Sequence, residues 1–79
     1  MPSASRPIVW SGDAEEDLFQ IWAYLARQTS QTAADRQIRT IRQACQRLAR
    51  LPYSGRPRDD LVSGIRSILI QPYVVFYRI

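Results

Sequence analysis

Residues 51–79 read LPYSGRPRDDLVSGIRSILIQPYVVFYRI, and this stretch decides the fold of the chain. The prolines and the glycine within residues 52–57 cannot continue a helix, so a preceding helix must end there. Residues 65–70 and 73–79 are rich in aromatic and β-branched side chains, which pack well on a pleated sheet. Because only residues 71–72 separate the two runs, we predict an antiparallel hairpin.

Such a hairpin is not stable alone, and its cover must come from the N-terminal half of the chain. Apolar residues recur there at helical spacing in two stretches. The first stretch contains Ala14, Leu18, Ile21, Trp22 and Leu25, widened by Phe19 and Ala26, and the second contains Ala34, Ile38, Ile41, Cys45 and Leu48. We expect Ile21, Leu25, Ile38, Ile41, Cys45 and Leu48 to be buried, and Phe19 and Trp22 to belong to the core rather than to a site.

The helix starts are predicted from capping signals. Residues 11–13 (SGD) are predicted to start the first helix, where Asp13 with Glu16 resembles a capping box, and Thr32 with Asp35 gives a second such signal. Residues 27–31 form a polar connection between the helices. Two such helices predict a helical hairpin.

The fold class expected is α+β, a single domain over residues 1–79 in the order strand, helix, helix, strand, strand. Residues 7–11 are expected to form the short N-terminal strand. The alternative is a plain lead-in to the first helix. Residues 1–6 are expected to be a flexible tail.

Composition excludes several kinds of site. The chain has 79 residues, a formal net charge of +4, eleven basic residues that are all arginine, no histidine and one cysteine, Cys45. The absence of histidine removes the usual general base and the commonest metal ligand, and a lone cysteine forms no internal disulfide. We therefore expect no metal and no cofactor. Without a signal peptide or a membrane-spanning run, we expect a cytoplasmic protein.

Four arginines, Arg36, Arg39, Arg47 and Arg50, fall on the face of the second helix opposite its apolar stripe. They could form a track for phosphates. The alternative is a solvated face, which we favour because no cluster of Lys, Asn or Gln accompanies the arginines as base readout would require.

The ordered set of motifs resembles the RelE/ParE superfamily of bacterial type II toxins, and its ParE branch most closely. The pattern A-x-x-D-L-x-x-I-x-x-Y runs from Ala14 to Tyr24. Leu48 and Leu51-Pro52 follow, then residues 55–58 (GRPR), Leu61, residues 64–66 (GIR) and residues 73–78 (YVVFYR). The resemblance covers about residue 8 to the end.

This resemblance implies a toxin that is neutralised by a cognate ParD-like antitoxin and that poisons DNA gyrase without being an enzyme. It implies operator DNA as a partner through the antitoxin complex, and no membrane. Residues that the resemblance and the charge balance suggest for partner binding are Tyr24, Arg56, Arg58, Arg66, Tyr73, Tyr77 and Arg78. For Arg56, Arg58 and Arg66 the alternative is loop charge that is solvated or paired with Asp59 and Asp60.

The other branch, RelE-like, cleaves mRNA on the ribosome. The resemblance to that branch would require an arginine after Tyr73, where this chain has Val74. Cleavage of a phosphodiester needs a base and cations for the developing charge. Arg66 and Arg78 could supply charge, but no convincing base is present beyond the candidates Tyr73 and Tyr77. We therefore expect no nuclease activity.

The chain stops at Ile79, where relatives continue into a further strand. We expect an unpaired strand edge there, filled by a partner or by self-association. The alternative interpretation is a truncated, non-toxic remnant that still binds an antitoxin.

Overall fold

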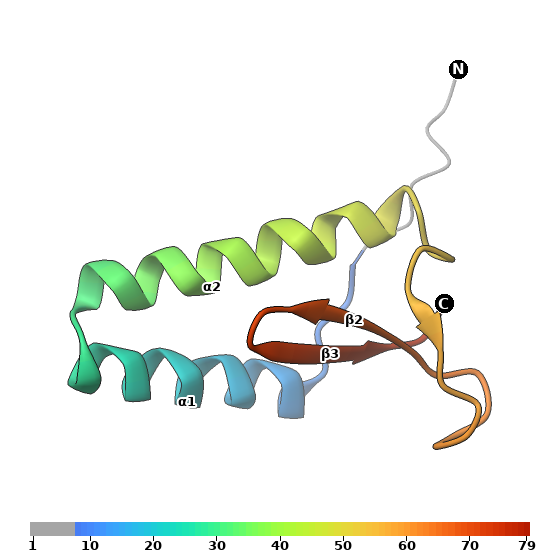
Figure 1. Cartoon of the computed structure of the whole chain (residues 1–79), viewed down its shortest axis with the longest axis horizontal. Helices are drawn as coiled ribbons and strands as arrows, with labels where there is room; N and C mark the ends of the chain where they lie inside the picture. Colours follow the sequence, from blue (N-terminus) through green and yellow to red (C-terminus); the bar gives the residue numbers. More distant parts are fainter. Residues whose placement is uncertain (1–7) are drawn as a thin grey trace.

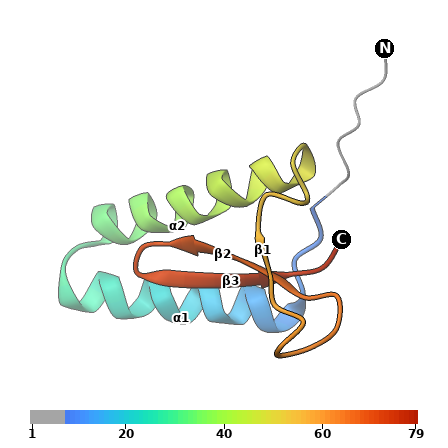
Figure 2. The same ribbon diagram turned by 45° about the vertical axis from the view of Figure 1, so that its right-hand side comes forward.

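The computed structural model describes residues 8–79 and shows two helices followed by a three-stranded antiparallel sheet (Figure 1). The elements are α1 (Gly12–Gln28), α2 (Gln31–Gln46), the short 3-10 helix η1 (Arg47–Ala49), β1 (Arg56–Pro57), β2 (Arg66–Ile70) and β3 (Tyr73–Tyr77). The helices run antiparallel, and the hairpin of β2 and β3 lies against them (Figures 1 and 2). The predicted α+β class is confirmed.

The first helix begins within the start predicted at residues 11–13, but serine side chains rather than Asp13 and Thr32 cap both helices. The Ser11 side chain accepts from the Ala14 N–H at 3.0 Å, and the Ser30 side chain accepts from the Ala33 N–H at 3.0 Å. Both serines have extended backbone dihedral angles, which suit the N-cap position. The predicted caps were wrong because Asp13 and Thr32 already lie inside the first helical turns. The connection is also shorter than predicted, since α1 ends at Gln28 and α2 begins at Gln31.

The core lies between the two helices and one face of the hairpin. Its buried cluster contains Leu18 from α1, Ile41 and Cys45 from α2, and Ile70 from β2. Of the residues predicted to be buried, Ile41, Cys45 and Leu48 are buried, whereas Ile21, Leu25 and Ile38 are half-buried.

Two aromatic residues of α1 were expected in the core, and one of them is not there. Phe19 is 57% exposed, because it follows Leu18 by one residue and therefore points well away from the stripe that faces the sheet. Trp22 is half-buried, and its ring N–H donates to the Asp35 carboxylate at 2.8 Å. Asp35 thus ties α2 to α1 instead of closing a capping box.

The predicted hairpin is confirmed, with strands slightly shorter than the predicted runs of residues 65–70 and 73–79. Ile68 pairs with Val75 and Ile70 pairs with Tyr73, and all four side chains belong to or pack against the core cluster. Leu69 and Val74, which form the pair between these two, point to the opposite face and are exposed. This alternation is the pattern of a sheet with one covered face.

The segment expected only to turn also supplies the edge strand β1. Arg56 pairs with Ser67 and Pro57 pairs with Arg66, and proline is tolerated in such an edge position. The N-terminal strand predicted at residues 7–11 is not formed by residues 8–11, which lead irregularly into α1. Pro7 and the tail predicted at residues 1–6 lie outside the described residues.

Candidate functional site

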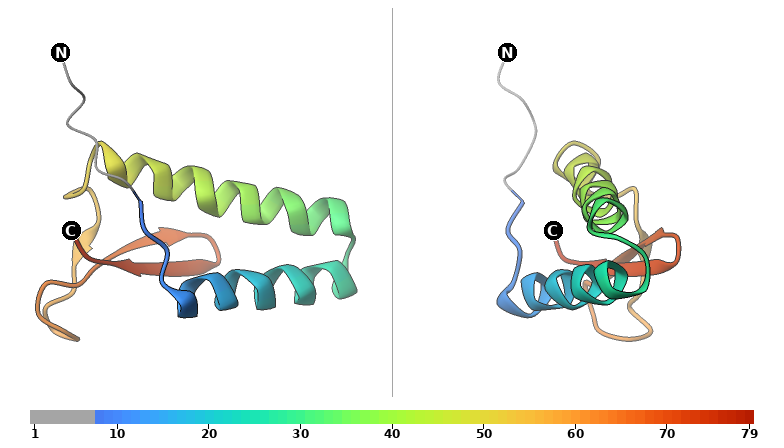
Figure 3. Two further views of the ribbon diagram at one scale, coloured as in Figure 1. Left: turned by 180° about the vertical axis from the view of Figure 1, so that it is seen from behind. Right: turned by 90° about the vertical axis from the view of Figure 1, so that its left-hand side faces the viewer.

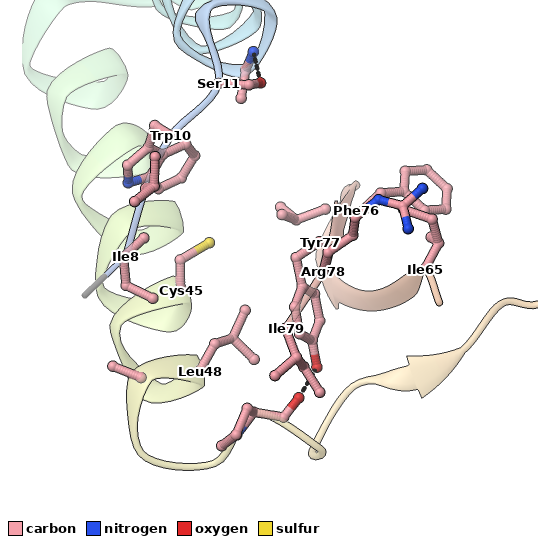
Figure 4. Close-up of a pocket in the computed structure, with 15 residues that line it drawn as sticks. Ile8, Trp10, Ser11, Cys45, Leu48, Ile65, Phe76, Tyr77, Arg78 and Ile79 are labelled. Carbon is pink, nitrogen blue, oxygen red and sulfur yellow. Dashed lines mark hydrogen bonds between the residues drawn. The ribbon is translucent and has the colours of Figure 1, made fainter. Parts of the chain in front are cut away.

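Arg66 and Tyr77, which pair across β2 and β3, hold the loop before β1 against the sheet. Arg66 donates through Nε and Nη2 to the Gly55 carbonyl at 3.1 and 2.7 Å, and through Nη2 to the Tyr53 carbonyl at 2.9 Å. The Tyr77 hydroxyl donates to the Pro52 carbonyl at 2.6 Å (Figure 4). It also accepts from the Gly55 N–H at 2.9 Å. We call Arg66 and Tyr77 the loop clamp, because together they satisfy backbone groups that no strand partner reaches.

The loop clamp requires glycine at position 55. Gly55 is buried, and a Cβ atom there would collide with the ring and hydroxyl of Tyr77 and lie 2.9 Å from the Ser67 carbonyl oxygen. Arg66 also lies over the ring of Tyr53, 5.3 Å from its centroid. Both clamp side chains are thus engaged within the fold.

The loop between β1 and β2 is held by a second set of contacts. Arg58 donates to both carboxylate oxygens of Asp60, at 3.2 and 3.3 Å, and lies 5.8 Å from the centroid of Phe76. The hydrogen bond from Arg58 lowers the pKa of the Asp60 carboxyl. The predicted pairing of Arg58 with Asp60 is confirmed, whereas Asp59 accepts from the Gly64 N–H at 2.8 Å.

Arg78 and Arg56 differ in their surroundings. Arg78 donates to the Ser63 carbonyl at 3.0 Å, next to Gly64, whose φ of 82° places it in the left-handed region. Arg56 is exposed on β1 and makes no ion pair with a described residue. Arg56 is therefore the candidate arginine of this region whose guanidinium makes neither an ion pair nor a hydrogen bond with residues 8–79.

A cleft of about 500 Å³ lies beside β3, between that strand, the end of α2 and the segment that leads into α1 (Figure 4). Its apolar walls include Ile8, Trp10, Cys45, Leu48, Val75 and Ile79. Residues 75–79 all line it, although alternate side chains of a strand point to opposite faces. The edge of β3 itself therefore borders the cleft. Within the described sheet, β3 pairs with β2 alone, so its other edge carries unpaired backbone groups.

Cys45 lines the cleft but is not set up as a nucleophile. Its side chain is 3% exposed, and burial raises the pKa of the thiol while nearby Arg42 partly opposes that rise. The thiol therefore stays protonated near neutral pH, and the protonated form is the unreactive one.

The structure does not gather the predicted partner-binding residues into one site. Arg66, Tyr77 and Arg78 meet around the loops at one end of the sheet, and Arg58 lies beside them on Phe76. Tyr73 packs on the core cluster at the other end of the hairpin. Tyr24 is 55% exposed on α1, away from the other partner-binding candidates.

Sequence reasoning missed the cleft. Ile8 and Trp10 were assigned to a strand, and Cys45 and Leu48 to a helix seam, but these segments are far apart in the chain. The available signal was the apolar run of residues 8–10 before a helix cap. Only the tertiary arrangement places that run opposite β3 (Figure 4).

Two other kinds of feature, a metal site and a membrane-spanning helix, are absent from the residues that the structure describes. Within residues 8–79, no group of three His, Cys, Asp or Glu side chains could hold a metal ion. No helix in that range is long and apolar enough to cross a membrane. The site combines an apolar cleft, an open strand edge and Arg78 in the lining of the cleft. These features suit the binding of an extended peptide.

The family described as the ParE toxin of the type II toxin-antitoxin system parDE matches residues 8–79. A search of curated proteins found no match.

Proposed function

Because the chain belongs to the ParE toxin family of type II toxin-antitoxin systems, we propose that it is neutralised by a cognate ParD-like antitoxin and acts in the cytoplasm on DNA gyrase. The observation that carries the proposal is the family match over residues 8–79, on a fold whose open sheet edge and cleft suit a peptide partner. The formal net charge of +4 favours an acidic partner segment.

We place the antitoxin contact at the cleft beside β3. An extended segment that adds to this edge would satisfy the unpaired backbone groups of β3 and bury apolar cleft walls such as Ile79, which is 46% exposed. A carboxylate placed there would repel an acidic segment and would cost desolvation on binding.

Co-purification with the product of the neighbouring reading frame tests this contact. Ile79→Asp should weaken the complex at least tenfold, because it puts a charge into the cleft. Val74→Asp is the matched control, since Val74 is 50% exposed on the same strand and does not line the cleft. Equal effects of the two variants would show that the antitoxin binds elsewhere.

The gyrase target is tested with purified gyrase and relaxed plasmid. The chain should inhibit supercoiling, and prior addition of the antitoxin should restore it. Antitoxin binding without any effect on gyrase would identify a binding module and would refute the toxin activity against gyrase.

We also propose that the chain acts by binding rather than by catalysis. The Tyr77 hydroxyl and the Arg66 guanidinium, which a ribonuclease would need free, are engaged by the backbone of the loop before β1. Incubation with translating ribosomes and mRNA should therefore yield no cleavage. Specific cleavage that disappears in Tyr77→Phe or Arg66→Gln would establish an mRNA endoribonuclease instead.

A further inference from the structure

The first helix carries a net negative charge, and the second helix with the residues that follow it carries a net positive charge. The range of α1 contains four acidic residues and one arginine, whereas residues 31–50 contain five arginines and one acidic residue, Asp35. Asp35 is bound to the Trp22 ring N–H, and Arg42 is paired with Glu15 at 2.8 Å on the side of α2 that faces α1. The remaining charges of α2 and η1 are therefore all positive.

Four of these arginines form one row along the outer side of α2. We call Arg36, Arg39, Arg47 and Arg50 the arginine row; all four are exposed, and none pairs with an acid among residues 8–79. At about 100° of rotation per residue of an α-helix, Arg36, Arg39 and Arg47 lie within roughly 50° of the direction opposite the buried side of α2, and Arg50 follows at the end of η1. No other described element covers that side (Figures 1 and 3).

Two glutamines accompany the arginine row. Gln43 and Gln46 lie between the two pairs of arginines and are exposed on the same face. Two glutamines are not the cluster that base readout would require, so that prediction stands, but phosphate binding needs no base readout and is not excluded by it. Glutamine donates and accepts hydrogen bonds without adding charge.

We propose that the arginine row is a binding surface for the phosphates of duplex DNA, contributed by this chain itself. The pair Arg36 and Arg39 stands about 17–18 Å along the axis from the pair Arg47 and Arg50, at about 1.5 Å per residue in α2 and about 2.0 Å per residue in η1. Flexible arginine side chains at that separation can reach phosphates on both sides of a major groove about 12 Å wide. The use of arginine alone favours phosphate, which its planar guanidinium binds through two hydrogen bonds.

Duplex DNA fits this surface better than an acidic peptide does. The exposed side chains of the row are arginine and glutamine, so a peptide laid on it would bury little apolar surface. DNA presents regularly spaced charges and gains affinity by releasing counterions, which needs only phosphate contacts. This surface is separate from the cleft beside β3, so both can be occupied at once.

The test is the salt dependence of binding between the full chain and a labelled 30-base-pair duplex, followed by fluorescence anisotropy. Four phosphate contacts predict a slope of log K against log salt of about −3.6, or a loss of about 150-fold in affinity between 50 and 200 mM salt. Arg39→Gln and Arg47→Gln should each reduce the slope to about −2.7, and the double variant to about −1.8.

Arg27→Gln is the matched control, because it removes one exposed arginine near the end of α1. It should leave the slope unchanged. Circular dichroism should show the same helix content in all variants, since glutamine and arginine have similar helix propensities. Equal slopes for Arg27→Gln and Arg39→Gln would overturn the proposal, because binding would then follow net charge.

A polyglutamate peptide supplies the second decisive comparison. If it binds the chain as tightly as the duplex does and loses affinity in Arg39→Gln, the surface fits acidic proteins and the proposal fails. Gyrase and the antitoxin are absent from these measurements, so their outcome is independent of the proposed toxin function.

Discussion

Replacing Tyr77 by phenylalanine removes one hydroxyl group and keeps the ring that packs on the sheet. The hydroxyl makes two part-buried hydrogen bonds, to the Pro52 carbonyl at 2.6 Å and from the Gly55 N–H at 2.9 Å. At about 0.5–1.5 kcal/mol of net stabilisation for each bond, their loss should lower the free energy of unfolding by about 1–3 kcal/mol. Unfolding temperatures of domains of this size fall by about 4–8 °C per kcal/mol, so we expect a drop of about 8–16 °C for a loss near the middle of that range.

Thermal and urea unfolding followed by circular dichroism measure this loss. Tyr53→Phe is the matched control, because Tyr53 is 70% exposed and its hydroxyl makes no hydrogen bond to the residues that the structure describes. The control should change the free energy of unfolding by less than about 0.5 kcal/mol, as surface substitutions usually do. If Tyr77→Phe is no more destabilising than Tyr53→Phe, the loop clamp does not stabilise the fold and the side chain is free for another role.

Three further predictions concern the core, the thiol and the strand edge. Ile41→Ala should destabilise the fold by about 2–5 kcal/mol in urea unfolding, since Ile41 is 1% exposed, and a loss below about 0.5 kcal/mol would exclude it from the core. Because burial raises the pKa of the Cys45 thiol, its thiolate fraction at pH 8 is below that of a free cysteine. A thiol reagent should therefore react much faster in denaturant, and equal rates in both conditions would contradict this reasoning. The open edge of β3 should make the purified chain self-associate with rising concentration in sedimentation experiments, whereas a monomer at all concentrations would show that the edge is covered.

The elements of the fold could be read from local patterns, and their ends could not. The apolar spacing of Ile38, Ile41 and Cys45 predicts a helix, and the run of residues 73–77 predicts a strand, because both signals lie within a few residues of each other in the chain. The N-cap residues are Ser11 and Ser30 instead of Asp13 and Thr32. Several neighbouring side chains can cap a helix, and the backbone angles decide which of them does.

Burial at the margins of a helix depended on what packs against it. Phe19 was expected in the core from its chemistry, but the hairpin lies over Leu18 and Ile21 and leaves Phe19 in water. A single helix face can cover only a limited arc, so an aromatic residue next to that arc has no partner.

The sequence by itself determined the hairpin, the two amphipathic helices and the family, because each depends on residue type and short spacing. The tertiary structure alone decided which arginines are free. Arg58, Arg66 and Arg78 resemble Arg36 and Arg39 as letters in the sequence, yet the first three bind Asp60 or the carbonyls of nearby loops. The same holds for the cleft beside β3, whose walls come from residues 8–11, α2 and the end of the chain. Whether an arginine has a partner, and whether a surface is concave, depends on residues that are distant in the chain. The chain brings such residues together only when it folds.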